Sequence, residues 1–120
     1  MSDVRNHEDL KAFTLADDLT ALTYRITENF PQRETFGLAA QIRKSAVSVP
    51  SNIVEGCARS SEPEFIRHLE IAYGSAKELQ YQVSLAHRLG YIGDDEYREF
   101  EDHCDETLRV LVGLIQALRD

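Results

Sequence analysis

Histidine, cysteine and glutamate are the side chains in this sequence that could hold a metal or catalyse a reaction. The histidines are His7, His68, His87 and His103, and no two are four residues apart, the spacing that places two imidazoles on one helical face. No cysteines form a Cys-x-x-Cys pair, and no glutamate precedes a histidine by three residues, as in di-iron helical bundles. The sequence therefore predicts no metal, no cofactor and no enzymatic activity.

A nucleophilic cysteine is the other catalytic alternative. Cys57 has no base beside it in the sequence and does not follow a helix N-terminus, the two features that activate a thiol. It instead continues an apolar row at helical spacing, formed by Ile42, Ala46, Val49 and Ile53. His103 and Cys104 are adjacent, so they project about 100° apart on a helix and are poorly placed to share a metal. Both cysteines are expected to be small buried residues.

A polar face follows the stretch SAVSVPSNIVEG, residues 45–56. Ser48, Asn52, Glu55 and Arg59 recur at steps of four, three and four, so they share one side of a helix. This side either lies in solvent, with Glu55 and Arg59 as an ion pair, or makes a buried polar contact with a neighbouring helix or subunit. The candidate interface or structural motif comprises Pro50, Asn52, Glu55, Gly56 and Arg59.

Basic side chains near this stretch could contact the phosphates of a nucleic acid. The candidates are Arg33, Arg43, Lys44, Arg59 and Arg67. Aromatic residues are not interleaved with them, and the net charge of −8 argues against general nucleic-acid binding. Most of that charge lies in residues 94–106, which hold eight acidic residues and one arginine. The remaining chain is close to neutral, so nucleic-acid binding stays an alternative hypothesis.

Apolar residues recur at helical spacing through the chain, and no segment alternates with the period of a strand. Four helices are expected, over residues 8–30, 35–59, 61–90 and 94–118. Thr35 and Asp94 are the expected N-caps of the second and fourth helices, and Ser61 with Glu64 fits a capping box for the third. Long helices with short links predict an all-α, antiparallel up-down-up-down four-helix bundle. Its core should include Ile42, Val49, Ile53, Leu69, Leu79, Leu111 and Ile115.

Pro50 lies inside the second predicted helix, where it cannot donate a hydrogen bond to the carbonyl of Ala46. The apolar row continues on both sides, so we expect the second helix to be bent at Pro50 and not ended there. The hydroxyls of Ser45, Ser48 and Ser51 are close enough in sequence to satisfy the freed backbone groups. The bend is expected to aim the polar face at a neighbour.

The length of 120 residues favours one domain, with a flexible N-terminus at residues 1–8 and the bundle at residues 9–120. No apolar run approaches the roughly 18 residues of a membrane-spanning helix. The first residues are polar and acidic, unlike a signal peptide. These features predict a cytoplasmic protein with no membrane contact and no small-molecule substrate.

A family resemblance is carried by the segments NFPQRETFGLAAQIRKSAVSVPSNIVEGCAR and EFIRHLEIAYGSAKELQYQVSLAHRLGYI. They closely resemble the four-helix bundle proteins encoded in intervening sequences of bacterial 23S ribosomal RNA genes. They are also similar, more distantly, to the accessory variability protein of diversity-generating retroelements. The most specific match is the Pro-x-Asn-Ile-x-Glu-Gly core at residues 50–56. The resemblance implies a homo-oligomer, with a ring-shaped pentamer expected, and no known enzymatic activity.

The leading hypothesis is a non-enzymatic, cytoplasmic homo-oligomer, with a pentameric ring favoured, that acts as a binding or scaffold module. Apolar residues off the seam of the third helix also indicate a subunit interface; these are Ile66, Ile71, Tyr73 and Tyr81. The alternative is an accessory protein that binds RNA, DNA or a nucleoprotein through the basic residues around the second helix. The retroelement relatives bind a reverse transcriptase and nucleic acid through a basic surface.

Overall fold

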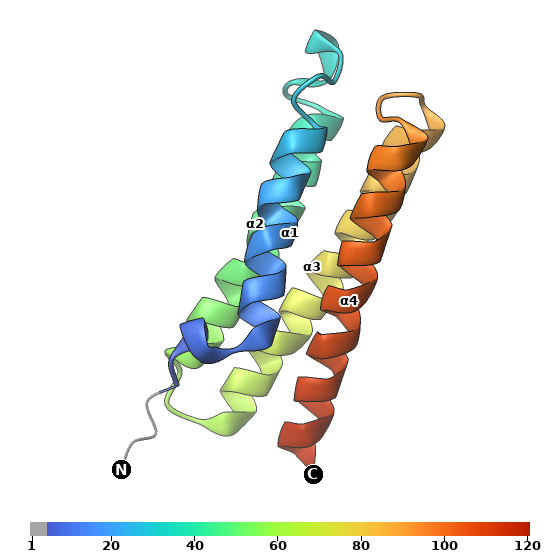
Figure 1. Ribbon diagram of the computed structural model, residues 1–120. Helices are drawn as coiled ribbons and strands as arrows, with labels where there is room; N and C mark the ends of the chain where they lie inside the picture. The colour runs from blue at the N-terminus through green and yellow to red at the C-terminus, as the bar shows by residue number, and fades with distance from the viewer. Residues whose placement is uncertain (1–4) are drawn as a thin grey trace.

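The computed structural model describes residues 5–120, which form four α-helices that run alternately up and down (Figure 1). The helices are α1 (Lys11–Ile26), α2 (Leu38–Cys57), α3 (Glu62–Arg88) and α4 (Asp94–Arg119), with 3-10 turns η1 (His7–Asp9) and η2 (Gln32–Glu34) before α1 and α2. Each helix contacts its two neighbours around the bundle, α1 and α3 each packing against both α2 and α4. The fold is therefore the all-α antiparallel four-helix bundle that the sequence predicts.

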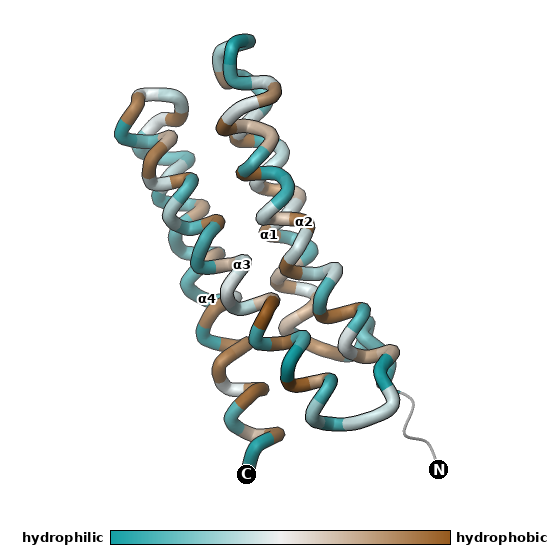
Figure 2. Tube along the Cα trace, turned by 180° about the vertical axis from the view of Figure 1, so that it is seen from behind, coloured by the Kyte–Doolittle hydropathy of each residue, from teal (hydrophilic) through white to brown (hydrophobic). Residues whose placement is uncertain are grey.

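The core is built from one apolar row on each helix. Figure 2 shows brown, hydrophobic positions recurring among teal, hydrophilic ones along the helices. All seven predicted core residues are buried, and Ile115 is the most exposed of them at 7%. Because every helix keeps a polar outer side, none formed by residues 5–120 is long and apolar enough to span a membrane.

The first two helices differ in their bounds from the prediction. Bonds between residues three apart tighten the chain into turns after Ile26, so α1 ends before residue 30. The second helix starts after Thr35, which lies at the end of η2, and Gly37 takes the N-cap position. The carboxylate of Glu34 accepts the N–H of Leu38 at 2.9 Å and so satisfies one of the free donors at the start of α2.

The fourth helix begins with a glycine cap instead of the predicted aspartate. Gly93 is the N-cap, and the carboxylate of Glu96 accepts its backbone N–H at 3.3 Å. Asp94 is the first helical residue, and its carboxylate lies 2.7 Å from His87 Nε2. The prediction of Asp94 as the cap was wrong because this carboxylate binds a side chain of α3 and not the backbone of α4.

The third helix is bounded as predicted. The Ser61 hydroxyl accepts the backbone N–H of Glu64 at 3.3 Å, which caps the first turn. At the other end Gly90 has φ of 81°, a conformation that glycine adopts without strain. The Tyr91 N–H then donates to the carbonyl of Ala86 at 2.9 Å, the long closing bond of a Schellman motif.

Pro50 is buried inside α2, and the helix continues through it without a break. The carbonyl oxygen of Ala46, which loses its helical donor to the proline, accepts a hydrogen bond from Thr20 Oγ1 of α1 at 3.0 Å. The donor is therefore a threonine of the neighbouring helix and not one of the serines suggested by the sequence. Ser48, one of those serines, hydrogen-bonds Ser75 of α3 instead. The bend at Pro50 stays a prediction.

The predicted flexible N-terminus, residues 1–8, is described only in part, because residues 1–4 lie outside the described residues. Arg5 donates to the carbonyl oxygen of Arg59 at 3.2 Å, and its guanidinium lies 4.5 Å from the centre of the Phe65 ring. This end of the described chain therefore rests on the link between α2 and α3. The domain boundary at residue 9 stays a prediction.

Candidate functional site

The polar face of α2 meets a single histidine of α3. Asn52 Oδ1 lies 3.2 Å from His68 Nδ1, and Arg59 Nε donates to His68 Nε2 at 3.1 Å. Glu55 accepts from the Arg59 guanidinium at 3.0 Å and places its other oxygen 4.0 Å from His68 Nδ1. Three residues of the predicted motif therefore lie around His68, a neighbour within the same chain. Asn52 is half-buried in this contact, whereas Glu55 and Arg59 stay exposed as an ion pair.

The contacts of His68 select one tautomer of its imidazole. Arg59 can only donate, so Nε2 must accept and the proton must lie on Nδ1. That N–H then points at the amide oxygen of Asn52, which completes the pairing of both ring nitrogens. His68 therefore links the amide of Asn52 to the guanidinium of Arg59. The sequence analysis missed it, although its place beside the core residue Leu69 on α3 was a usable signal.

Asn52 extends this contact one turn along α2. Its amide nitrogen donates to the carbonyl oxygen of Ser48 at 2.9 Å and approaches the Ser48 hydroxyl at 3.1 Å. That hydroxyl lies 2.8 Å from the hydroxyl of Ser75 on α3. A continuous row of polar contacts thus joins α2 to α3. These contacts require that Ser48 and Asn52 of α2 lie level with Ser75 and His68 of α3.

Gly56 lies where α2 and α3 approach each other closely. A Cβ atom at this position would lie 2.9 Å from the Cβ of His68, 3.1 Å from a ring carbon of Phe65 and 3.3 Å from the Phe65 carbonyl oxygen. Such distances leave no room for a side chain, so glycine permits the approach that brings His68 within reach of Asn52. The Pro-x-Asn-Ile-x-Glu-Gly segment therefore serves to pack α2 against its neighbouring helices.

Two of the predicted nucleic-acid contacts, Arg33 and Arg43, make interactions within the chain. Arg43 Nε donates to Thr27 Oγ1 at 2.8 Å, and its guanidinium lies 4.7 Å from the centre of the Tyr24 ring. The Arg33 guanidinium lies 6.0 Å from the centre of the Tyr91 ring. These arginines fasten α2 to α1 and the α1–α2 link to the α3–α4 link.

The remaining basic candidates do not lie together, because Lys44 is in the N-terminal half of α2 whereas Arg59 and Arg67 lie near the link between α2 and α3. Arg59 is committed to His68 and Glu55 near the far end of α2. Sixteen residues separate it from Arg43, a rise of roughly 24 Å along a helix. Lys44 and Arg67 are exposed and have no ion pair or side-chain hydrogen bond within residues 5–120. The structure therefore does not gather the five candidates into one patch.

Both cysteines are buried, as the sequence predicts. Burial raises the pKa of Cys57 above its ordinary value. Burial, followed by the charges of Glu101 and Asp105, raises the pKa of Cys104 to about 12. A thiol with a raised pKa is a poor nucleophile at neutral pH, so neither cysteine is poised for catalysis.

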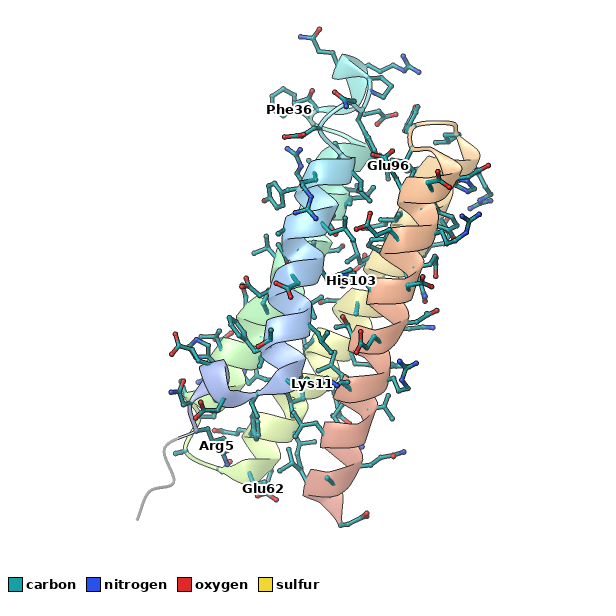
Figure 3. The ribbon with its side chains drawn as sticks, viewed as in Figure 1. Arg5, Lys11, Phe36, Glu62, Glu96 and His103 are labelled. Atoms are coloured by element: carbon teal, nitrogen blue, oxygen red, sulfur yellow. The ribbon has the colours of Figure 1, made fainter. Side chains whose placement is uncertain are left out.

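The histidines and acidic residues of the described chain do not assemble a metal centre. No three His, Cys, Asp or Glu side chains of residues 5–120 lie where they could hold one ion together. His87 pairs with Asp94 and stacks on Tyr97, with ring centres 4.2 Å apart. His103 Nδ1 is buried without a hydrogen-bond partner within the described residues, and the side chain lies on α4 (Figure 3).

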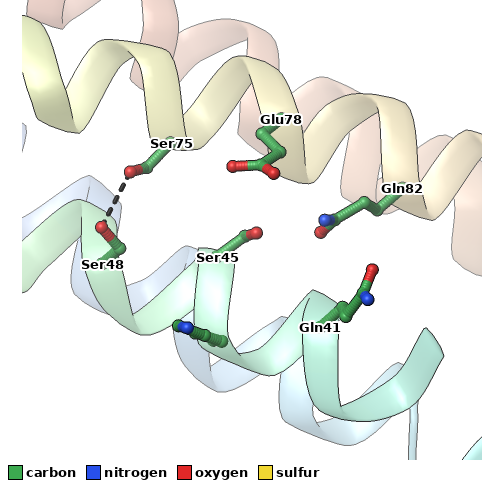
Figure 4. Close-up of a pocket in the computed structure, with 7 residues that line it drawn as sticks. Gln41, Ser45, Ser48, Ser75, Glu78 and Gln82 are labelled. Atoms are coloured by element: carbon green, nitrogen blue, oxygen red, sulfur yellow. Dashed lines mark hydrogen bonds between the residues drawn. The ribbon is translucent and has the colours of Figure 1, made fainter. Parts of the chain in front are cut away.

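A polar groove of about 370 Å³ separates α2 from α3 on the side of the Ser48–Ser75 contact that leads toward the α1–α2 link (Figure 4). We call it the α2–α3 groove. Its lining residues are Gln41, Lys44, Ser45, Ser48, Ser75, Glu78 and Gln82. Gln82 is only 8% exposed, and its Oε1 atom has no hydrogen-bond partner within the described residues. Sequence analysis did not single out these residues, because they become neighbours only when the two helices pack.

Large apolar side chains are exposed on α1, α2, α3 and the links, but none of them lies on α4. Val47 and Val54 are seven residues apart on α2 and share one face of it. On α3, Ile71 and Tyr81 are exposed as predicted, whereas Ile66 and Tyr73 pack against the core; the prediction for that second pair was wrong because their positions turn toward α4. Phe36, 95% exposed, projects from the α1–α2 link (Figure 3).

Comparisons with known proteins assign the family. The family model described as 23S rRNA-intervening sequence protein matches residues 8–113. A crystal structure of a protein with unknown function from the S23 ribosomal protein family of Bacteroides thetaiotaomicron is similar, with a TM-score of 0.78, 25% sequence identity and coverage of 87% of this chain and 97% of that chain. No curated protein matches the chain. Since the matched residues span α1, α2, α3 and most of α4, the chain belongs to the family of 23S rRNA intervening-sequence proteins.

Proposed function

We propose that the chain is a non-enzymatic homo-oligomer whose copies close into a ring, with a pentamer favoured, and that the ring acts as a binding or scaffold module. The observation that carries this proposal is that the bundle has two unlike faces. One face exposes apolar side chains and Lys44 on α1 and α2, with Asp17 and Asp18 beside them on α1, and the other exposes acidic side chains on α4.

The apolar and basic face is centred on α2. Val47 and Val54 are 40% and 37% exposed, and Tyr24 of the adjoining α1 is 41% exposed. Arg43 joins these two helices through its contact with Tyr24, and Lys44 follows it on α2. Exposed apolar side chains that recur along one helix face commonly mark a protein contact.

The acidic face is the outer side of the N-terminal half of α4. Its exposed acids are Asp94, Asp95, Glu96, Glu99, Asp102 and Asp105. None of the large exposed apolar side chains within residues 5–120 lies on this helix, so the two faces differ in their exposed apolar side chains. A contact between such unlike faces is heterologous, and heterologous contacts between identical copies produce rings when the rotation closes.

The proposal of a non-enzymatic role rests on how the motif residues are used. Asn52 and Arg59 hydrogen-bond His68, Glu55 accepts from Arg59, and Gly56 permits the close approach of α3. These polar residues support the architecture of the subunit, which leaves the outer surfaces for partners.

Light scattering after gel filtration, together with native mass spectrometry, tests the ring. The expected result is a closed particle of five chains of 13.6 kDa each, stable at micromolar concentration. A strict monomer at that concentration overturns the proposal.

A second proposal is that the protein binds RNA, DNA or a nucleoprotein. It is supported by Lys44 and Arg67, whose charges have no ion-pair partner within the described residues. Phosphate contacts release counterions, so binding through these residues must weaken as salt rises. Binding that does not change with salt contradicts this second role.

A further inference from the structure

We propose that the α2–α3 groove is a binding site for a small zwitterionic molecule of the free amino-acid class. This inference goes beyond the proposed assembly, because it concerns a site built within one subunit. It starts from the floor of the groove, where a buried amide lacks a partner.

The floor of the groove has an unused hydrogen-bond acceptor. Gln82 is more than nine-tenths buried, and Figure 4 shows its side chain extending from α3 into the groove toward Gln41 and Ser45. Its Oε1 atom is sealed from solvent and has no donor within residues 5–120. Buried polar atoms in folded proteins almost always have a partner. A rotation of the Gln82 amide toward the groove would present this oxygen to an N–H donor of an occupant.

The walls of the groove carry opposite charges that are not paired with each other. Lys44 lies on α2 and Glu78 on α3, and neither makes an ion pair in the described part of the chain. Glu78 is one turn from Gln82 on α3, so a single ammonium group could approach both. Lys44 lies on the opposite wall beside the hydroxyls of Ser45 and Ser48, a set of groups suited to a carboxylate.

The lining also excludes other ligand classes. It holds amides, hydroxyls and two charged groups but no aromatic ring, so it offers nothing on which a nucleobase or a sugar ring could stack. The volume of about 370 Å³ falls within the range of small-molecule sites. A free amino acid supplies an ammonium, a carboxylate and N–H donors in one molecule of suitable size.

The experiment is a ¹H–¹⁵N NMR titration of the full chain that follows the side-chain amide signals of Gln82 and Gln41. The probes are L-glutamine, L-serine and L-arginine in turn, each added up to about 50 mM. Two analogues of L-glutamine serve as controls, 4-aminobutanamide without the carboxylate and glutaramic acid without the ammonium. A saturable shift of the Gln82 amide with at least one amino acid, together with roughly tenfold weaker binding of both analogues, is expected.

Two variants make the test specific. Gln82→Leu removes the buried acceptor and is expected to abolish the saturable response of the Gln41 amide. Glu78→Gln is a surface change that leaves the fold intact and is expected to weaken binding roughly tenfold, whereas Glu62→Gln, elsewhere on α3, should not change it. The proposal is overturned if none of the three amino acids gives a saturable shift of the Gln82 amide. It is also overturned if the analogues bind as tightly as L-glutamine or if Glu78→Gln leaves the affinity unchanged.

Discussion

The hydroxyl of Thr20 on α1 lies 3.0 Å from the carbonyl oxygen of Ala46 on α2, the acceptor that Pro50 deprives of its helical donor. The same hydroxyl lies 2.8 Å from the carbonyl of Ala16 in its own helix, so its proton is shared between two helices. A side chain from the neighbouring helix thus accommodates a proline in the middle of a helix. The free-energy cost of that proline therefore depends on the packing of α1 on α2.

This coupling can be measured directly. Thr20→Val keeps the shape of the side chain but leaves the Ala46 carbonyl without a donor, and we expect a loss of about 1–2 kcal/mol in the free energy of unfolding. Pro50→Ala restores the backbone N–H, so the same threonine change should cost less in that background. The free energy of unfolding is measured in denaturant, at one fixed chain concentration, for the original chain, the two single variants and the double variant. Thr20→Ser is the control that retains the hydroxyl, and equal costs of Thr20→Val in both backgrounds contradict the coupling.

Gly56 and Gly113 offer a matched pair of helical glycines. Alanine favours a helix over glycine by about 1 kcal/mol, so Gly113→Ala, at an exposed site with nothing within 4 Å of the new Cβ, should stabilise the protein. Gly56→Ala should instead lower the free energy of unfolding by about 1–3 kcal/mol, because its Cβ would meet His68 and the backbone of Phe65. Thermal and denaturant unfolding check both. A stabilised Gly56→Ala variant would show that α2 and α3 do not need this close approach.

The link between α1 and α2 should respond to acid through Glu34. The N–H of Leu38, followed by the hydroxyl of Tyr91, holds the pKa of this carboxyl below its ordinary value of 4.5. Since the charged form is favoured in the folded state, the stabilisation is complete above pH 4.5 and is lost as the pH falls through the lower folded pKa. An NMR titration of the Glu34 carboxyl should therefore have its midpoint below 4.5. Tyr91→Phe should move the midpoint upward, and an unchanged midpoint in that variant argues against the hydroxyl contact.

The proposed ring contact predicts that charge on the apolar face of α2 separates the subunits. Val47→Glu together with Val54→Glu should shift the assembly toward monomer, because buried carboxylates would replace apolar contact area. Both positions are partly exposed, so the helical content by circular dichroism should not change. Gln116→Glu on the exposed side of α4 is the matched control and should leave the particle mass unaltered. If the double variant keeps the mass of the original particle, the contact lies elsewhere on the surface.

The nucleic-acid proposal is best tested with the basic residues that are not used by the fold. Lys44→Glu together with Arg67→Glu should weaken RNA or DNA binding and flatten its dependence on salt, since each lost phosphate contact reduces the slope by about one. Arg43→Glu is a poorer choice, because it also removes the contacts with Thr27 and Tyr24. Arg109→Glu, on the exposed side of α4, is the control for a change of net charge alone. Equal weakening by the control points to a general charge effect.

Much of the fold could be predicted because helical periodicity and burial act locally along the chain. The rows that contain Ile42, Val49 and Leu69 place these residues in the core whatever the neighbouring helix is. The cap at Ser61 and the stop at Gly90 are also local, since their partners lie within a few residues. The start of α2 and the cap of α4 differ from the prediction. Glu34 and Glu96 accept the N–H groups there, while Thr35 lies at the end of η2 and Asp94 pairs with His87.

The sequence by itself determined the four helices, their apolar faces and the family, whose model matches residues 8–113. The sequence also singled out the segment around Pro50. Only the tertiary structure decided the partners of that segment. Thr20 donates to the carbonyl of Ala46, 26 residues away in the sequence. His68 contacts Asn52 and Arg59, which precede it by 16 and 9 residues. A helical repeat tells which side chains share a face, but hydrogen bonds require a specific axial register and a close approach between two helices, and these follow from the packing of the whole bundle.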